Sequence, residues 1–268
     1  MEQTKRINLH TLLGMHAAGE KITVLTCYDA TFARVLDLAG VDVLLVGDSL
    51  GMVLGGMPTT LSVDMATMVY HTSCVARGAR RPWLIADMPF GSYHESPAQA
   101  FTNAARLIQA GAQMVKVEGG EWVAPTIRFL VERGMPVCAH VGFTPQAVHA
   151  LGGFRIQGKN DAAVQQLLRD AEAVAGAGAQ MLVLELVPSP VTELLAARIG
   201  IPVIGIGAGS HCAGQVLVLH DMLGITQGPV PRFVRNFLHG ATSIQEAVAN
   251  YVAAVKARQF PDDTTHGY

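Results

Sequence analysis

The chain alternates short apolar runs with longer amphipathic stretches, and this alternation limits its fold more than any other feature. Continuous runs of Val, Ile and Leu are typical of parallel strands that are covered on both faces. Parallel neighbours also need a crossover between them, which is usually a helix. The sequence predicts eight such strands, at residues 21–27, 42–48, 82–87, 113–119, 136–142, 180–185, 202–207 and 215–221.

The stretches between these runs carry helix signals. Residues 62–78 predict a helix with Ser62 as its N-cap, and residues 96–111 predict one that begins with Ser96 and Pro97. Residues 160–178 repeat that pattern. Glycines that directly precede the next strand are expected to be helix C-caps, at Gly40, Gly78, Gly111 and Gly134.

Eight strands that alternate with helices predict one (β/α)₈ TIM barrel spanning residues 1–268. An open, doubly wound sheet is the alternative. Residues 8–19 are expected to form a helix that packs on the barrel, and one or two helices are expected after Gly224. The polar residues at about 257–268 are expected to be a loose tail.

Composition narrows the class of protein. Half of the residues are hydrophobic and 15% are charged, which predicts a large core and a buried subunit interface. The 19 basic and 21 acidic residues are mixed along the chain, which argues against a nucleic-acid partner. No apolar stretch is long enough for a transmembrane helix, and the N-terminus lacks the apolar core of a signal peptide. The four cysteines lack metal-ligand spacing, which favours a reducing cytoplasmic location.

Polar residues gather where the predicted strands end. In a barrel of this type the active site forms at the carboxyl ends of the strands. The candidates at these ends are Asp48, Ser49, Asp87, Lys116, Glu118, His140, Glu185, the glycines of "GIGAG" (205–209), His220 and Asp221.

Asp48, Asp87 and Glu118 follow three successive strands. Three carboxylates at one rim repel each other unless a cation lies between them. Hard oxygen ligands suit Mg²⁺, although other divalent ions fit the same pattern. The alternative is that each carboxylate only caps a helix or binds loop amides.

Lys116 and Glu118 are two residues apart in "MVKVEGG", so on a strand they share one face. That face is expected to line the mouth of the barrel. Lys116 could form a structural ion pair, hold a substrate oxygen, or form a Schiff base as in lysine-dependent aldolases.

Glu185 ends the apolar run "MLVLE", where apolar surroundings raise a carboxyl pKa and favour a general base. A buried ion-pair partner is the alternative. His140 could be a ligand, a hydrogen-bond donor to substrate, or a satisfied core histidine. The "GIGAG" glycines suit either a phosphate site or a tight turn, and the tight turn is favoured. His220 and Asp221 receive no role.

The joint pattern of motifs resembles one enzyme family. "VGDSLGM", "ADMPFGSY", "MVKVEGG", "VCAHVGFTPQ", "GGFRIQGK", "LVLELVP" and "PVIGIGAG" occur in this order within about residues 5–255. Together they resemble the ketopantoate hydroxymethyltransferase (3-methyl-2-oxobutanoate hydroxymethyltransferase) family.

The resemblance implies a barrel of the phosphoenolpyruvate mutase and isocitrate lyase group. It implies transfer of a hydroxymethyl group from 5,10-methylenetetrahydrofolate to 3-methyl-2-oxobutanoate through a metal-stabilised enolate. The products are 2-dehydropantoate and tetrahydrofolate, on the route to pantothenate and coenzyme A. It also implies a homodecamer.

The resemblance further implies roles for single residues. Asp48, Asp87 and Glu118 would hold Mg²⁺, and Glu185 would accept the proton. Contacts to the oxo acid would come from Asp48, Ser49, Asp87 and Lys116. His140 is added to these contacts because of its position at a strand end. The alternatives are a related Mg²⁺-dependent oxo-acid carbon–carbon lyase, a lysine-dependent aldolase, and a catalytically inactive barrel that binds a metabolite or partner.

Overall fold

A closed barrel of eight parallel strands forms the centre of the protein. The computed structural model describes residues 5–268, and residues 1–4 of the N-terminal stretch lie outside the described part. The strands pair in chain order and close between the first and the eighth. This confirms the barrel and rules out the open sheet. The strands are β1 (Ile22–Thr26), β2 (Val43–Val46), β3 (Trp83–Asp87), β4 (Met114–Glu118), β5 (Val137–Gly142), β6 (Met181–Glu185), β7 (Val203–Ile206) and β8 (Gly214–Leu217).

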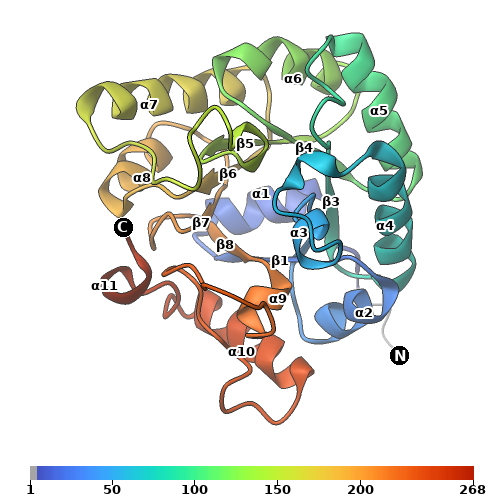
Figure 1. Cartoon of the computed structure of the whole chain (residues 1–268), viewed down its shortest axis with the longest axis vertical. Helices are drawn as coiled ribbons and strands as arrows, with labels where there is room; N and C mark the ends of the chain where they lie inside the picture. The colour runs from blue at the N-terminus through green and yellow to red at the C-terminus, as the bar shows by residue number, and fades with distance from the viewer. Residues whose placement is uncertain (1–4) are drawn as a thin grey trace.

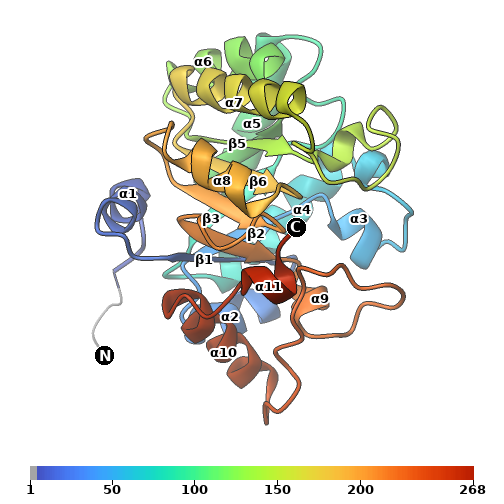
Figure 2. The same ribbon diagram turned by 90° about the vertical axis from the view of Figure 1, so that its left-hand side faces the viewer.

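Helices surround this barrel (Figure 1). The longer ones are α1 (Leu9–Ala17), α2 (Ala30–Leu38), α4 (Met65–Gly78), α5 (Pro97–Gln109), α6 (Ala124–Val131), α7 (Asp161–Gly176), α8 (Ser189–Ala196) and α10 (Ile244–Lys256). The short ones are α3 (Leu50–Val53), α9 (Leu219–Met222) and α11 (Asp263–His266). Figure 2 shows α1 at one end of the barrel and α3, α9 and α11 at the other.

Side-chain alternation divides the core into two parts. On β4, Val115 and Val117 belong to the cluster between the strands and the helices, whereas Met114 belongs to the cluster inside the barrel. Leu12 and Met15 of α1 join this inner cluster and so close the barrel at the amino ends of the strands. The interior is therefore apolar at that end, and polar side chains are left for the other.

Most of the predicted helix boundaries are confirmed. Ser96 caps α5 by accepting a hydrogen bond from the backbone of Gln99, and Asn160 caps α7 in the same way. Ser62 as the cap of α4 was wrong, because the Asp64 carboxylate accepts the hydrogen bond from Thr67 N–H instead.

Gly78 is a second correction, because it is the last residue of α4 and not a left-handed C-cap. A Cβ atom there would lie 2.2 Å from the carbonyl oxygen of Ala30, so glycine lets α2 and α4 approach closely. The other three predicted C-cap glycines do have positive φ angles.

The C-terminal segment is ordered by specific contacts, which contradicts the expected loose tail at residues 257–268. Phe260 is buried, and Asp263 begins α11. The Asp263 carboxylate accepts hydrogen bonds from the hydroxyl groups of Ser189 and Ser210, at 2.7 and 2.9 Å. Polar residues are therefore satisfied here by partners from distant parts of the chain.

Candidate active site

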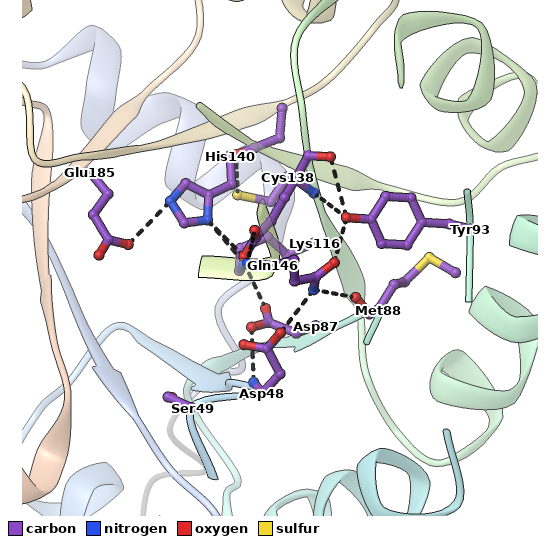
Figure 3. Close-up of polar contacts among 12 residues, drawn as sticks. Asp48, Ser49, Asp87, Met88, Tyr93, Lys116, Cys138, His140, Gln146 and Glu185 are labelled. Atoms are coloured by element: carbon purple, nitrogen blue, oxygen red, sulfur yellow. Dashed lines mark hydrogen bonds and ion pairs between the residues drawn. The ribbon is translucent and has the colours of Figure 1, made fainter. Parts of the chain in front are cut away.

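Most of the polar residues predicted at the strand ends meet inside the mouth of the barrel (Figure 3). Lys116 and Glu118 both point inward from β4, and their Nζ and Oε1 atoms are 3.5 Å apart. Lys116 Nζ also lies 3.3 Å from Oδ1 of Asp87, the last residue of β3. The strand registers explain these contacts, because Asp87 is opposite Lys116 and Glu118 is opposite His140.

Asp48 lies in the loop after β2 and adjoins Asp87. Its backbone N–H donates to Oδ2 of Asp87 at 3.0 Å. Ser49 stands at the start of α3, and its hydroxyl lies 2.9 Å from the Tyr28 hydroxyl. The two carboxylates therefore lie side by side at one wall of the mouth, with Ser49 next to them in the chain.

His140 connects Glu118 to Glu185. Its Nδ1 lies 3.4 Å from Oε1 of Glu118, and its Nε2 lies 3.3 Å from Oε2 of Glu185. The Glu185 side chain is 12% exposed, against 4% for Lys116 and Glu118, so Glu185 is the more open of these groups. Gly142 lets the backbone approach Glu185, because a Cβ atom there would lie 2.4 Å from the Glu185 carbonyl oxygen.

Burial and mutual charge shift the pKa values of these groups. Burial raises the pKa values of Asp48 and Asp87, and for Asp48 the neighbouring carboxylates raise it further. Burial would lower the pKa of Lys116, but the three carboxylates around it outweigh burial and raise that pKa. Lys116 is therefore protonated at neutral pH.

Two glutamates respond in opposite directions. Burial alone would raise the pKa of Glu118, but the charge of Lys116 and the contact with His140 lower it overall. Burial raises the pKa of Glu185, and its contact with His140 offsets this rise only in part. Glu185 is thus a stronger base than an ordinary glutamate.

Two of the carboxylates in this cluster are suited to hold a divalent cation. Asp87 Oδ1 and Glu118 Oε1 are buried and face the Lys116 ammonium group, but neither makes a hydrogen bond among the described residues. Within residues 5–268, no three His, Cys, Asp or Glu side chains are arranged around one ion position. Mg²⁺ is commonly held by one or two carboxylates together with water and substrate oxygens, so Asp48 and Asp87 fit it as a pair. Glu118 as a third ligand stays a prediction.

Residues 6–263 match the sequence profile of the ketopantoate hydroxymethyltransferases. The chain belongs to this family. It is 62% identical to 3-methyl-2-oxobutanoate hydroxymethyltransferase 2 of Methylibium petroleiphilum, over 98% of this chain and 95% of the relative. It is 60% identical to the enzyme of Methylobacillus flagellatus, over 95% and 97%. The predicted family resemblance is confirmed, and the ketopantoate hydroxymethyltransferases are transferases.

Solved structures with the same fold come from the phosphoenolpyruvate mutase and isocitrate lyase group. One is 2,3-dimethylmalate lyase, with a TM-score of 0.58 and 16% identity over 78% of this chain and 80% of that one. Another is phosphoenolpyruvate phosphomutase of Streptomyces platensis, with a TM-score of 0.61 and 15% identity over 81% and 83%. At this identity, the likenesses show that this ketopantoate hydroxymethyltransferase family member shares its fold with those enzymes.

Two residues of the site carried no predicted role. The side-chain amide of Gln146 donates to Asp48 Oδ2 at 2.8 Å, and the backbone N–H of Gln146 donates to Glu118 Oε2 at 2.9 Å. The Tyr93 hydroxyl donates to Gln146 Oε1 at 2.7 Å. Both residues occur in motifs that resemble those of the ketopantoate hydroxymethyltransferases. These motifs were the sequence signal that could have identified the two residues as part of the site. They lie outside the strands, so side-chain alternation could not place them.

His220, Asp221 and the "GIGAG" glycines are the remaining predicted rim residues. His220 and Asp221 do not end a strand but lie on α9, where the Asp221 carboxylate accepts a hydrogen bond from Thr226. In "GIGAG", Gly207 and Gly209 have positive φ angles, which agrees with the favoured tight turn.

No helix in the described residues is long and apolar enough to cross a membrane.

Proposed function

We propose that this protein transfers a one-carbon unit from 5,10-methylenetetrahydrofolate to 3-methyl-2-oxobutanoate. With one water, the products are 2-dehydropantoate and tetrahydrofolate, which supply pantothenate and coenzyme A synthesis. The relatives named for this activity support the proposal. The structural observation that carries it is the partly open Glu185, a carboxylate of raised pKa that His140 contacts 3.3 Å away.

Glu185 is the proposed base that removes the C3 proton of the oxo acid. A base must be deprotonated and still have affinity for a proton, which a moderately raised pKa provides. His140 holds the carboxylate in place through Nε2. After proton removal, negative charge develops on the 2-oxo oxygen, and the ammonium group of Lys116 is the nearby cationic side chain that would stabilise it.

Asp48, Ser49, Asp87, Lys116 and His140 are the proposed contacts to the oxo acid. Asp48 and Asp87, together with Glu118 as the third ligand that the family resemblance implies, would hold Mg²⁺ or another divalent ion. When bound, this ion supplies positive charge next to the oxygen atoms of the oxo acid. A phosphonopyruvate hydrolase of similar fold was solved with oxalate and Mg²⁺, but at 15% identity it relates to this chain only by fold.

A cytoplasmic homodecamer is also part of the proposal. Support comes from the family resemblance, from the apolar composition of the chain and from exposed hydrophobic side chains such as Leu38 and Tyr70, which lie on helices at the outside of the barrel.

Proton exchange tests the proposed function directly. The protein is incubated with 3-methyl-2-oxobutanoate in D₂O, with Mg²⁺ or with chelator, and the C3 proton is followed by NMR before the folate donor is added. We expect exchange that depends on the metal, and product only with 5,10-methylenetetrahydrofolate. Cleavage of an oxo acid without the donor would instead favour the related lyase. Neither exchange nor product would refute the proposal.

A further inference from the structure

Aromatic rings gather at the rim beside Glu118, on the loop after β3 and on the segment after β4. We call Phe90, Tyr93, His94 and Trp122 the aromatic platform. The Tyr93 and Trp122 rings are nearly parallel, at 14° with centroids 6.2 Å apart. The His94 ring lies 4.1 Å from Tyr93 and 5.3 Å from Trp122, and the Phe90 ring meets it at 5.0 Å.

Hydrogen bonds connect the aromatic platform to the polar residues at the mouth of the barrel. The Tyr93 hydroxyl accepts the backbone N–H of Glu118 at 3.0 Å and donates to Gln146. Trp122 covers Gly119, where a Cβ atom would lie 2.5 Å from the indole Nε1. Figure 3 shows Tyr93 across the Lys116 cluster from Glu185. The stacked rings are thus held in a fixed place beside the proposed oxo-acid site.

The outer rings of the platform are open. Trp122 is 55% exposed and Phe90 is 49% exposed, although both are large apolar side chains. Adjoining apolar side chains that stay exposed at the mouth of a site mark a binding surface. The proposed oxo-acid contacts use the buried carboxylates, Lys116 and Glu185. They do not provide a binding site for the second substrate.

We infer that the aromatic platform binds the one-carbon donor by the planar pyrimidine half of its reduced pteridine ring system. This inference rests on the proposed function, because transfer requires a donor whose carbon reaches the oxo acid. Stacking on aromatic side chains suits a neutral planar ring. Glu95 and Glu121, which adjoin His94 and Trp122 in the sequence, are exposed, and their negative charge opposes a phosphate group at this surface.

The two tryptophans provide a direct test. Trp122 is exposed on the platform, whereas Trp83 is 6% exposed at the opposite, amino end of β3. Titration of the intact protein with tetrahydrofolate should quench tryptophan fluorescence. The quenching should persist in Trp83→Phe and should be lost in Trp122→Phe. Equal quenching in both variants would overturn the inference.

Kinetics give the second readout. Since stacking of one ring contributes about 1–3 kcal/mol, Trp122→Ala should raise the KM for the donor roughly 5- to 150-fold. The KM for the oxo acid should change at least tenfold less. An equal rise in both KM values would indicate a structural role and overturn the inference.

Two other results are distinguishable. If Trp122→Ala changes the oligomeric mass in light scattering and leaves tetrahydrofolate binding intact, the platform is a contact between copies of the chain and the inference fails. If the wild-type protein shows no C3 proton exchange, the proposed function fails at the oxo acid. Normal exchange with unchanged donor affinity in Trp122→Ala refutes only the platform.

Discussion

Nε2 of His140 lies 3.3 Å from Oε2 of Glu185, so the proposed base is held by a ring that is itself buried. The opposite nitrogen of the same ring faces Glu118. Burial and the charge of Lys116 would lower the His140 pKa, but the two glutamate contacts outweigh both and raise that pKa overall. This pair of contacts orients Glu185 and links it to the carboxylates of the other wall.

Replacement of the base should separate binding from chemistry. Glu185→Gln should retain affinity for 3-methyl-2-oxobutanoate, because the other polar contacts remain. It should lower C3 proton exchange at least about 100-fold, since an amide cannot accept the proton. NMR exchange and calorimetric binding measure the two effects. Glu193→Gln, an exposed glutamate on α8, is the control, and normal exchange in Glu185→Gln would remove the base assignment.

The pH dependence should follow Glu185. Burial raises its pKa, and only the carboxylate form accepts a proton, so exchange should fall as pH decreases through this raised pKa. Contact with His140 lowers the pKa, so His140→Asn should move the acid limb of the exchange profile to higher pH. A limb that stays in place or moves to lower pH would contradict the proposed contact.

Lys116 should not form a Schiff base. Imine formation needs a neutral amine, whereas the surrounding carboxylates raise the Lys116 pKa and keep it protonated. Borohydride added with 3-methyl-2-oxobutanoate should leave activity unchanged, and mass spectrometry should find no added mass on Lys116. A reduced adduct on the peptide that contains Lys116 would favour the lysine-dependent aldolase instead.

Gln146 should tune metal affinity through Asp48. Its amide hydrogen bond lowers the Asp48 pKa, so Gln146→Leu should favour the protonated acid and weaken Mg²⁺ binding. Loss of such a supporting contact commonly weakens metal affinity about 10- to 100-fold. The Mg²⁺ concentration for half-maximal exchange measures this, with exposed Gln166→Leu as the control. An unchanged Mg²⁺ requirement would dissociate Gln146 from the metal site.

Glycine should be required at position 78 because a side chain would not fit between α2 and α4. It should not be required for a positive φ angle. In Gly78→Ala the new methyl group meets Ala30 on α2, so the free energy of unfolding should fall by about 1–3 kcal/mol. The matched control is Gly176→Ala on α7, where nothing lies within 4 Å of the added Cβ atom. It should be neutral or stabilising by up to about 1 kcal/mol. Urea titration compares the two variants, and equal stability would refute the close contact.

The strand pattern made much of the site predictable. Because side chains on a strand alternate, "MVKVEGG" alone placed Lys116 and Glu118 on one face, and the parallel order of the strands brought Asp87 and His140 to the same rim. The barrel follows from eight repeats of one local pattern. Helix caps such as Ser96 and Asn160 depend only on neighbouring residues, and they were predicted correctly.

The contacts of residues outside the strands could not be predicted from side-chain alternation. Gln146 belongs to a short 3₁₀ segment, Pro145–Ala147, and its partners Asp48 and Met88 come from far away in the chain. The polar C-terminal segment was misjudged for the same reason, because Asp263 finds its partners in Ser189 and Ser210. Composition near a residue says nothing about partners that are distant in sequence.

The sequence by itself determined the barrel, the inward face of each strand and the acidic and basic groups at its rim, because these depend on periodicities of two to four residues. Only the tertiary structure decided that the Lys116 ammonium contacts both Asp87 and Glu118, that His140 joins two glutamates, and that Tyr93 and Gln146 fix the rim. Those contacts depend on strand register and loop path, which closure of the whole barrel sets.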